Sequence, residues 1–247
     1  MIQKVIRTIK RHVELLKEKS ALKNLSNDES ELISNIKDGN LTYLTKRKLA
    51  SLVYSLNEAN ASNLEGLIIE AGCALGGSAI LMAKLKNPNT SFQIYDVFGM
   101  IPSPTIEDTK DVHERYKIIS EGKSIGIKGE TYYGYEEDLL DKVIKNLKAF
   151  NVIPDNDNVI LIKGLVQETM NINEPVVLAH VDVDWYEPVK TCLDQICPNL
   201  VIGGSIILDD YHYWGGCRKA TDEYFKGLED QYHLDDRYDS MKATRIK

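Results

Sequence analysis

Hydrophobic residues in the first sixty positions recur at helical spacing. Residues 27–31 open a second helix, and residues 44–59 carry a third with its apolar positions on one face. We therefore expect an N-terminal helical extension over residues 1–60. The first helix carries an apolar stripe at Ile2, Val5, Ile6, Ile9, Val13 and Leu16.

From residue 64 onward, short apolar runs alternate with amphipathic stretches. Such alternation predicts an α/β domain over residues 61–247, with a doubly wound, mostly parallel sheet. Sheets of this type bind ligands beyond the carboxyl ends of their strands. The expected strands are 67–69, 92–95, 159–162, 176–183 and 201–208, and the expected helices are 79–85, 136–150, 188–196 and 218–225.

The segment 97–135 interrupts this alternation and is much longer than an ordinary loop. We interpret it as a lid that contacts the acceptor substrate, because aromatic and basic side chains together suit a sugar face and a phosphate. A solvated helix and loop is the alternative. The candidate acceptor-binding residues are His113, Arg115, Tyr132, Tyr133 and Tyr135, with Tyr211 from outside the lid.

The composition excludes some classes of binding partner and cellular location. The 247 residues include 37 acidic and 30 basic side chains, a net charge of -7, which argues against a nucleic-acid-binding protein. The four cysteines form no repeated Cys-x-x-Cys pattern, so we expect buried thiols and a cytoplasmic location. The first helix lacks the uninterrupted apolar run of a signal peptide or a membrane span. We expect it to form a homodimer or a higher homo-oligomer, without stable membrane insertion.

The segment from Ile68 to Ser78 reads as a strand, a glycine-rich turn and a helix. Glycines allow the backbone to approach a ligand closely, and the helix N-terminus offers free N–H groups to a carboxylate or phosphate. Ala74 interrupts the dehydrogenase pattern G-x-G-x-x-G, which disfavours a dinucleotide site. Asp96 ends the next strand, where an acid accepts hydrogen bonds from the ribose of an adenosine cofactor.

Two acidic clusters follow neighbouring strands. The first is HVDVDWY at residues 180–186, and the second is LDDYH at residues 208–212. Carboxylates that converge at one edge of a sheet repel one another unless they bind a cation or are well solvated. Oxygen ligands of this kind suit Mg²⁺, Mn²⁺ or Ca²⁺. Solvated acids that cap the following helices are the alternative.

These motifs carry a family resemblance. IEAGCALGGSAILMAK is similar to the first motif of catechol O-methyltransferase-like enzymes, and HVDVDWYEPVKTCLDQICPNLVIGGSIILDDYHYWGGCRKATDEYF resembles the TylF/MycF (macrocin O-methyltransferase) family. The resemblance extends from about Leu64 to Phe225. It implies a Rossmann-like class I methyltransferase fold, S-adenosylmethionine, a divalent metal, and methyl transfer to a hydroxyl, often that of a sugar.

Matching by position assigns roles to single residues. Trp185 stands where the catechol enzymes have a basic lysine, so the base stays open among His212, Asp184 and Asp182. The metal ligands that the resemblance implies are Asp182, Asp209 and Asp210. The cofactor-binding residues are Glu70, Gly72, Gly76, Ser78, Asp96, Gly164 and Asp182.

The expected function is therefore metal-assisted O-methylation of a small-molecule or sugar-linked acceptor, with or without a phosphate. The family context suggests a glycan or polysaccharide, antibiotic or nucleotide-sugar pathway. Two alternatives stay open. Asp182-Val183-Asp184 is formally the D-x-D of metal-dependent glycosyltransferases, and a non-catalytic S-adenosylmethionine-binding module would share the cofactor motifs.

Overall fold

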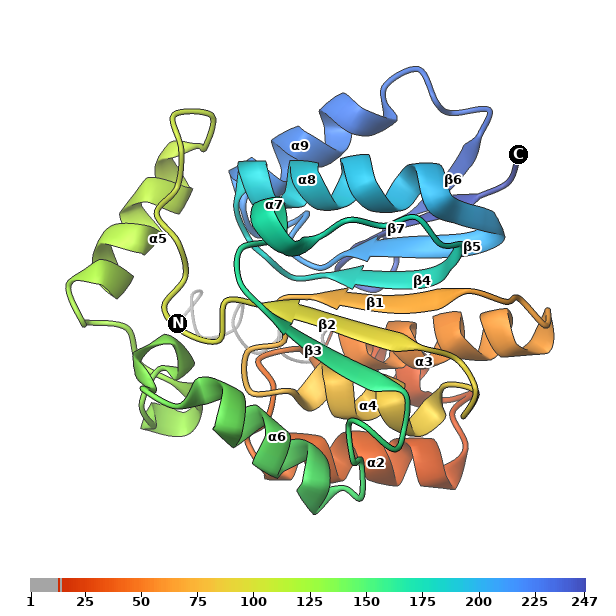
Figure 1. Ribbon diagram of the computed structural model, residues 1–247, viewed down its shortest axis with the longest axis horizontal. Coiled ribbons are helices and arrows are strands. Elements are labelled where there is room, and N and C mark those ends of the chain that lie inside the picture. The colour runs from red at the N-terminus through yellow and green to blue at the C-terminus, as the bar shows by residue number, and fades with distance from the viewer. Residues whose placement is uncertain (1–12, 14) are drawn as a thin grey trace.

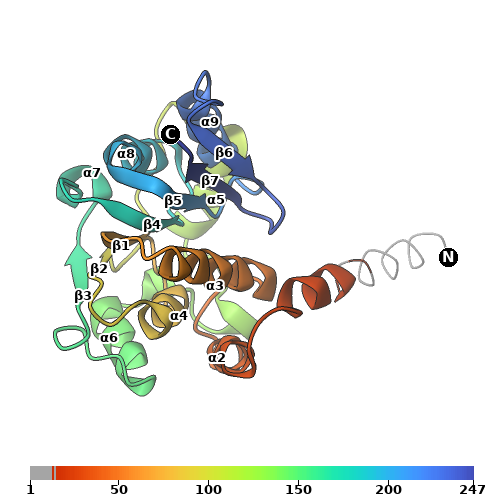
Figure 2. The same ribbon diagram turned by 90° about the vertical axis from the view of Figure 1, so that its right-hand side faces the viewer.

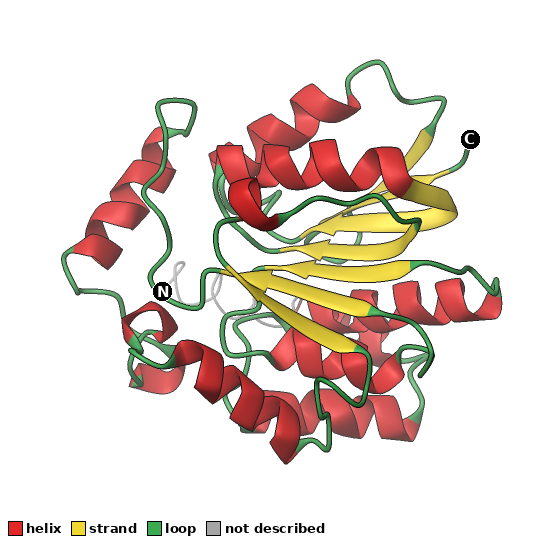
Figure 3. Ribbon diagram, viewed as in Figure 1, coloured by secondary structure: helices red, strands yellow, loops and turns green. Residues whose placement is uncertain are grey.

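The computed structural model of the protein describes Val13 and residues 15–247. A seven-stranded sheet lies between two layers of helices (Figure 1; Figure 3). The predicted stripe positions Ile2, Val5, Ile6 and Ile9 lie outside the described residues. The strands are β1 (Leu67–Ala71), β2 (Phe92–Asp96), β3 (Val159–Lys163), β4 (Val176–Val181), β5 (Leu200–Leu208), β6 (Tyr232–Asp235) and β7 (Met241–Arg245).

The strand order is β3-β2-β1-β4-β5-β7-β6. Strands β1 to β5 pair in parallel, as predicted, whereas β7 pairs antiparallel with β5 and with β6. The predicted doubly wound, mostly parallel sheet is confirmed. The terminal hairpin was not predicted, because its two short strands are largely polar and contain no apolar run.

Helices cover both faces of the sheet and divide the core between them. One face carries α2 (Asn27–Asp38), α3 (Lys46–Ala61), α4 (Gly77–Leu85) and α6 (Leu139–Ala149), and the other carries α7 (Val166–Thr169), α8 (Tyr186–Ile196) and α9 (Gly215–Phe225) (Figure 1). The lid contributes α5 (Lys110–Ser120) and the short helices η1 (Ile127–Gly129) and η2 (Tyr133–Tyr135). A third short helix, η3 (Cys197–Asn199), precedes β5.

The N-terminal extension belongs to this core. Ser26 starts α2 with a capping box, in which its hydroxyl accepts from the backbone of Glu29 and the Glu29 carboxylate accepts in return. Ile33 and Ile36 of α2 are fully buried in the same cluster as residues of α3 and α4. Two of the three predicted N-terminal helices thus form part of one sheet-covering layer. The four cysteines are all buried and free, as expected.

Ahead of α2, residues 15–22 are helical. The start of this helix projects from the body of the molecule (Figure 2), whereas its end packs on the body, since Ala21 is buried and its carbonyl oxygen accepts from the Tyr54 hydroxyl of α3. Val13 is 42% exposed and Leu16 is 54% exposed, so the described end of the predicted stripe faces solvent. Among the residues that the structure describes, no helix has the length and apolar character needed to span a membrane.

Candidate active site

A cavity of about 460 Å³ opens beyond the carboxyl ends of the parallel strands. This is the position that the doubly wound topology predicts for a ligand. The cavity is enclosed by the strand ends, the lid and the start of α3. Its lining includes these predicted site residues: Gly72, Asp96, Arg115, Tyr132, Tyr133, Gly164, Asp182, Asp184, Asp209 and Asp210.

Gly72 and Asp96 shape the turn after β1. Gly72 has φ +82°, and a Cβ at this position would lie 2.0 Å from the carbonyl oxygen of Asp182, so only glycine allows β1 and β4 to end side by side. Asp96 Oδ2 accepts hydrogen bonds from the backbone N–H of Cys73 (2.7 Å) and of Ala74 (3.3 Å), and Oδ1 accepts from Phe98 (2.7 Å). The Asp96 carboxylate therefore fixes the glycine-rich turn and also faces the cavity.

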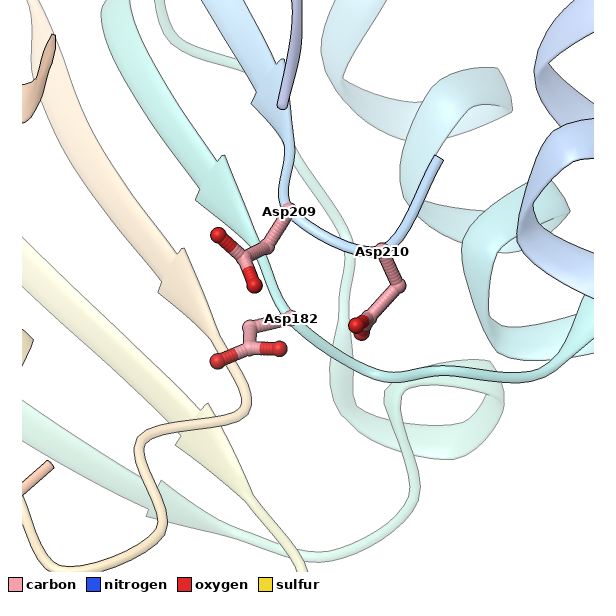
Figure 4. Close-up of side chains that lie close together, drawn as sticks. All are labelled: Asp182, Asp209 and Asp210. Atoms are coloured by element: carbon pink, nitrogen blue, oxygen red, sulfur yellow. The ribbon is translucent and has the colours of Figure 1, made fainter. Parts of the chain in front are cut away.

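Three carboxylates gather on the far side of this turn (Figure 4). Asp182 follows β4, and Asp209 and Asp210 follow β5. One oxygen from each lies within 4.8 Å of the others. Within the described chain, Asp210 Oδ2 is buried and has no hydrogen-bond partner. A buried carboxylate oxygen without a partner is costly, and a divalent cation at this position would satisfy it.

The pKa values of the clustered carboxyl groups also indicate a cation site. Burial raises the pKa of Asp182 well above its usual value, and the charges of Asp209 and Asp210 raise it further. Burial and the charge of Asp210 likewise raise the pKa of Asp184 well above its usual value. Burial and the charge of Asp209 raise the pKa of Asp210. The cluster holds more negative charge than its surroundings balance, which is the condition of a cation site.

Asp209 differs from its neighbours, because side chains from three elements hold it. Lys48 of α3 donates to Asp209 Oδ2 at 2.6 Å, and Ser240 donates to Oδ1 at 3.1 Å. His180 Nε2 lies 3.8 Å from Oδ1. Although burial raises the pKa of Asp209, the nearby imidazole of His180 and the charge of Lys48 outweigh it and leave this pKa below its usual value.

Asp184 lines the same cavity, two residues beyond Asp182. Its backbone has φ +58°, a left-handed conformation that few residues other than glycine adopt, although aspartate tolerates it better than most. Such conformations cluster at functional sites. The cavity wall therefore carries a further carboxyl group beside the metal-ligand candidates.

Aromatic side chains form the other wall. Trp185 and Trp214 meet edge to face with ring centroids 5.9 Å apart, and the indole N–H of Trp185 donates to the carbonyl oxygen of Pro102 in the lid. Tyr132 lies beside Tyr133, and Arg115 lies 5.7 Å from the centre of the Tyr132 ring. The predicted roles of Arg115, Tyr132 and Tyr133 in acceptor binding are consistent with these positions.

Three predicted cofactor residues lie behind the cavity instead of lining it. Glu70 is fully buried and pairs with His180, whose Nδ1 lies 3.1 Å from Glu70 Oε1, because the two residues face each other in the register of β1 and β4. Ser78 is buried in the first turn of α4. Gly76 has φ +86° and caps α4, with the ideal Cβ position 3.1 Å from Val143. These three residues lie next to the glycine-rich turn, on the side away from the cavity.

Four other predicted residues also lie outside the cavity lining. His113 is exposed on α5, and the hydroxyl of Tyr135 is engaged within the lid by Ser124 and Ile119. The hydroxyl of Tyr211 donates to Asp222 of α9. His212 is partly exposed, with Nε2 3.7 Å from Asp236. His212 follows Asp210 closely in sequence, but the turn after β5 directs the chain away from the cluster.

Sequence reasoning missed Lys48 and Ser240, which join the site from the two ends of the chain. Neither belongs to a recognisable motif, and their contact with Asp209 depends on the packing of α3 and the terminal hairpin against β5. Tyr43, Gln167 and Tyr213 also line the cavity without having been predicted.

Comparison with known proteins agrees with this geometry. The chain is 21% identical to demethyldecarbamoylnovobiocin O-methyltransferase of Streptomyces niveus, over 74% of this chain and 67% of that protein. It is 23% identical to 8-demethyl-8-(2,3-dimethoxy-alpha-L-rhamnosyl)-tetracenomycin-C 4'-O-methyltransferase of Streptomyces olivaceus, over 83% and 74%. The structure of the O-methyltransferase NovP superposes with a TM-score of 0.69 at 20% identity, covering 84% of this chain and 83% of that one. The model of the macrocin-O-methyltransferase (TylF) family matches residues 3–230. The chain therefore belongs to the macrocin O-methyltransferase family.

Proposed function

We propose that this O-methyltransferase moves the methyl group of S-adenosylmethionine to a hydroxyl of a sugar or other natural-product acceptor, with a divalent cation held by Asp182, Asp209 and Asp210. The observation that carries the proposal is the shared cavity. It brings the glycine turn with Asp96, the three carboxylates and the aromatic lid wall together around one space. Membership of a methyltransferase family sets aside the glycosyltransferase interpretation of Asp182-Val183-Asp184.

Different residues of this chain serve the cofactor and the acceptor. Gly72, Asp96 and Gly164 hold the cofactor end, and the acidic cluster with the aromatic wall holds the acceptor end. S-adenosylmethionine would supply a methyl group on a positively charged sulfur, and a divalent cation held by the three carboxylates would lower the pKa of the acceptor hydroxyl. Asp184 takes the hydroxyl proton while the acceptor oxygen forms its bond to the methyl carbon and the carbon–sulfur bond breaks. Alignment of the two reactants contributes on the order of 7–11 kcal/mol to lowering the barrier.

The aromatic wall and Arg115 favour a particular kind of acceptor. Tyrosine and tryptophan faces pack well against the C–H face of a sugar ring, and a guanidinium binds a carboxylate or phosphate. One relative methylates the 4'-oxygen of a substituted rhamnosyl group, according to its name. We infer a glycosylated or sugar-linked acceptor for this chain, and the partly buried Arg115 makes an anionic group on that acceptor a reasonable feature to test.

The first test removes one metal ligand without changing its shape. We expect Asp210→Asn to lower turnover at least about 100-fold, because the unpartnered Oδ2 loses its charge, while S-adenosylmethionine affinity changes little. Calorimetry with S-adenosylmethionine and a labelled-methyl assay with sugar acceptors measure the two effects. Asp194→Asn, on the outer side of α8, is the matched control. Full activity of wild type in EDTA, or of Asp210→Asn, would contradict the metal role.

The second test concerns the base. Asp184→Asn should reduce turnover by about 10²- to 10⁴-fold, the usual contribution of a general base. His212→Asn should leave turnover unchanged, because His212 lies outside the cavity. Both variants are assayed with saturating S-adenosylmethionine. The opposite ranking, an inactive His212 variant beside an active Asp184 variant, would return the role to the histidine.

We also infer a homodimer. Val13, Leu15 and Leu16 leave apolar area in water on the projecting part of the helix before α2, and exposed apolar patches of this kind mark interfaces. The net charge of -7 disfavours attraction to an anionic lipid surface.

A further inference from the structure

We propose that Lys48 is a positioning residue of the transfer site, and that its charge competes with the divalent cation for Asp209 and limits how tightly the cluster binds metal. The proposal rests on the cation-assisted function above and adds a group from the N-terminal extension to it. Lys48 reaches the cluster from α3, far from the strand ends in sequence.

The ammonium group of Lys48 is held in one position by burial and by its hydrogen bonds. Its side chain is 6% exposed, and Nζ donates to Asp209 Oδ2 at 2.6 Å and to the Asp209 carbonyl oxygen at 3.0 Å. The ammonium also lies 4.3 Å from the centre of the Tyr213 ring, a cation–π contact. An ammonium that donates to a carboxylate at this distance forms a charge-assisted hydrogen bond, so Lys48 places a positive charge directly on Asp209.

The position of Lys48 is unfavourable for its own helix. Thr45 caps α3 and accepts from the backbone N–H of Lys48, so the first turn carries Lys46, Arg47 and Lys48 and no acidic residue. Cations at a helix N-terminus oppose the helix dipole. Contacts elsewhere must compensate, and the contact that Lys48 makes is with a metal-ligand candidate. Local rules are broken in this way mainly at functional sites.

The contact with Lys48 makes Asp209 different from the other two ligand candidates. Both oxygens of Asp209 have protein partners, Lys48 on Oδ2 and Ser240 on Oδ1, whereas Asp210 Oδ2 has none within the described chain. A cation bound by the cluster would therefore draw mainly on Asp182 and Asp210 and share Asp209 with the ammonium. A cation shared in this way would be repelled by the ammonium, so the cluster would bind metal less tightly than its three carboxylates alone would.

The test compares Mn²⁺ binding by wild type, Lys48→Met and Lys48→Arg, with free Mn²⁺ measured by electron paramagnetic resonance. We expect the dissociation constant for Mn²⁺ to fall at least about tenfold in Lys48→Met, since the competing charge is gone. Lys48→Arg keeps the charge and should stay close to wild type. Turnover of Lys48→Met should fall while the KM for S-adenosylmethionine is unchanged, because Asp209 has lost its anchor.

Lys86 provides a matched control. It is a second buried lysine, 6% exposed, but its ammonium donates only to backbone carbonyl oxygens of Asn87, Pro88 and Thr90, away from the cavity. Lys86→Met should change stability without changing Mn²⁺ affinity. If Lys48→Met does not fold, as circular dichroism would show, Lys48→Gln removes the charge and retains a hydrogen-bond donor for Asp209, and it decides the question in the same way.

The outcomes separate this inference from the proposed function. Weaker or unchanged Mn²⁺ binding in the neutral variants would overturn the role of Lys48 and leave cation assistance intact. Mn²⁺ binding by the neutral variant but not by wild type would support competition and contradict cation assistance in the native enzyme. Absence of binding in every variant, with S-adenosylmethionine still bound, would overturn both.

Discussion

Asp96 illustrates how a single side chain organises the cofactor end of the cavity. Its two oxygens accept three backbone hydrogen bonds, two from the glycine-rich turn and one from Phe98. Burial raises the pKa of Asp96, and the hydrogen bonds from the Cys73 and Phe98 backbones oppose that rise. The residue thus builds the glycine-rich turn, in addition to its proposed role as a hydrogen-bond acceptor for the ribose.

We therefore predict that Asp96→Ala weakens S-adenosylmethionine binding about ten- to hundredfold, the loss of about 1.5–3 kcal/mol from a charge-assisted hydrogen bond. The affinity for Mn²⁺ should change little, because Asp96 ends β2, whereas the three carboxylates of the cluster follow β4 and β5. Asp157→Ala, which removes a surface carboxylate that accepts from the Ile153 backbone, is the control. Calorimetry gives both dissociation constants, and an unchanged value for S-adenosylmethionine would remove Asp96 from the cofactor site.

At the scale of elements, the register of β1 against β4 has a consequence for stability. Glu70 and His180 are directly paired across the two strands, and His180 also approaches Asp209 after β5. Burial by itself would lower the pKa of His180, but the nearby Asp209 carboxylate and the hydrogen bond to Glu70 raise it to about 9. Three neighbouring strands are thus joined by one buried charged group beneath the cavity floor.

This arrangement predicts a pH dependence in metal-free protein. The folded state binds the His180 proton more tightly than the unfolded state, so the stabilisation is complete below about pH 6.5 and is lost as the pH rises through about 9. The loss is on the order of 3 kcal/mol. Urea unfolding in EDTA across this range measures it. His180→Gln should flatten the profile, whereas His233→Gln on the outer strand β6 should not. A wild-type profile as flat as that of His180→Gln would contradict the charged pair.

At the scale of the whole molecule, the N-terminal extension has two parts with different roles. Helices α2 and α3 complete the layer beneath the sheet, and α3 also supplies Lys48 to the site. Arg47, next to it, binds Asp239 at 2.6 Å and so ties α3 to the turn of the terminal hairpin. The start of the helix before α2 projects from this layer (Figure 2), while its end at Ala21 is buried and bonded to Tyr54 of α3.

Removal of residues 1–19 should therefore yield a folded monomer, because this cut leaves the buried residues of α2 and α3 in place. A cut near Asn40 would take away the buried Ile33 and Ile36 of α2 and would test stability instead of assembly. Light scattering reports the mass, and thermal unfolding checks the fold. A full-length monomer that sediments with anionic vesicles would favour a membrane-surface helix, and a truncated protein that is still dimeric would place the interface elsewhere.

The sequence by itself determined the five parallel strands and the strand ends at which the candidate site lies. Alternating apolar runs predicted all five parallel strands, because buried strands need continuous apolar residues, and the topology rule then placed Asp96, Asp182, Asp209 and Asp210 at one edge. The glycine turn was recognisable from its glycines between an apolar strand and a helix, and the structure adds the reason for Gly72, whose Cβ would meet the Asp182 carbonyl oxygen.

Only the tertiary structure decided which of these residues face the cavity. Glu70 and His212 lie within predicted motifs, yet strand register directs Glu70 to His180, and the turn after β5 leaves His212 near Asp236. Lys48 and Ser240 join Asp209 from opposite ends of the chain. Such contacts depend on how helices and hairpins pack on the sheet, and local sequence patterns carry no information about packing between distant segments.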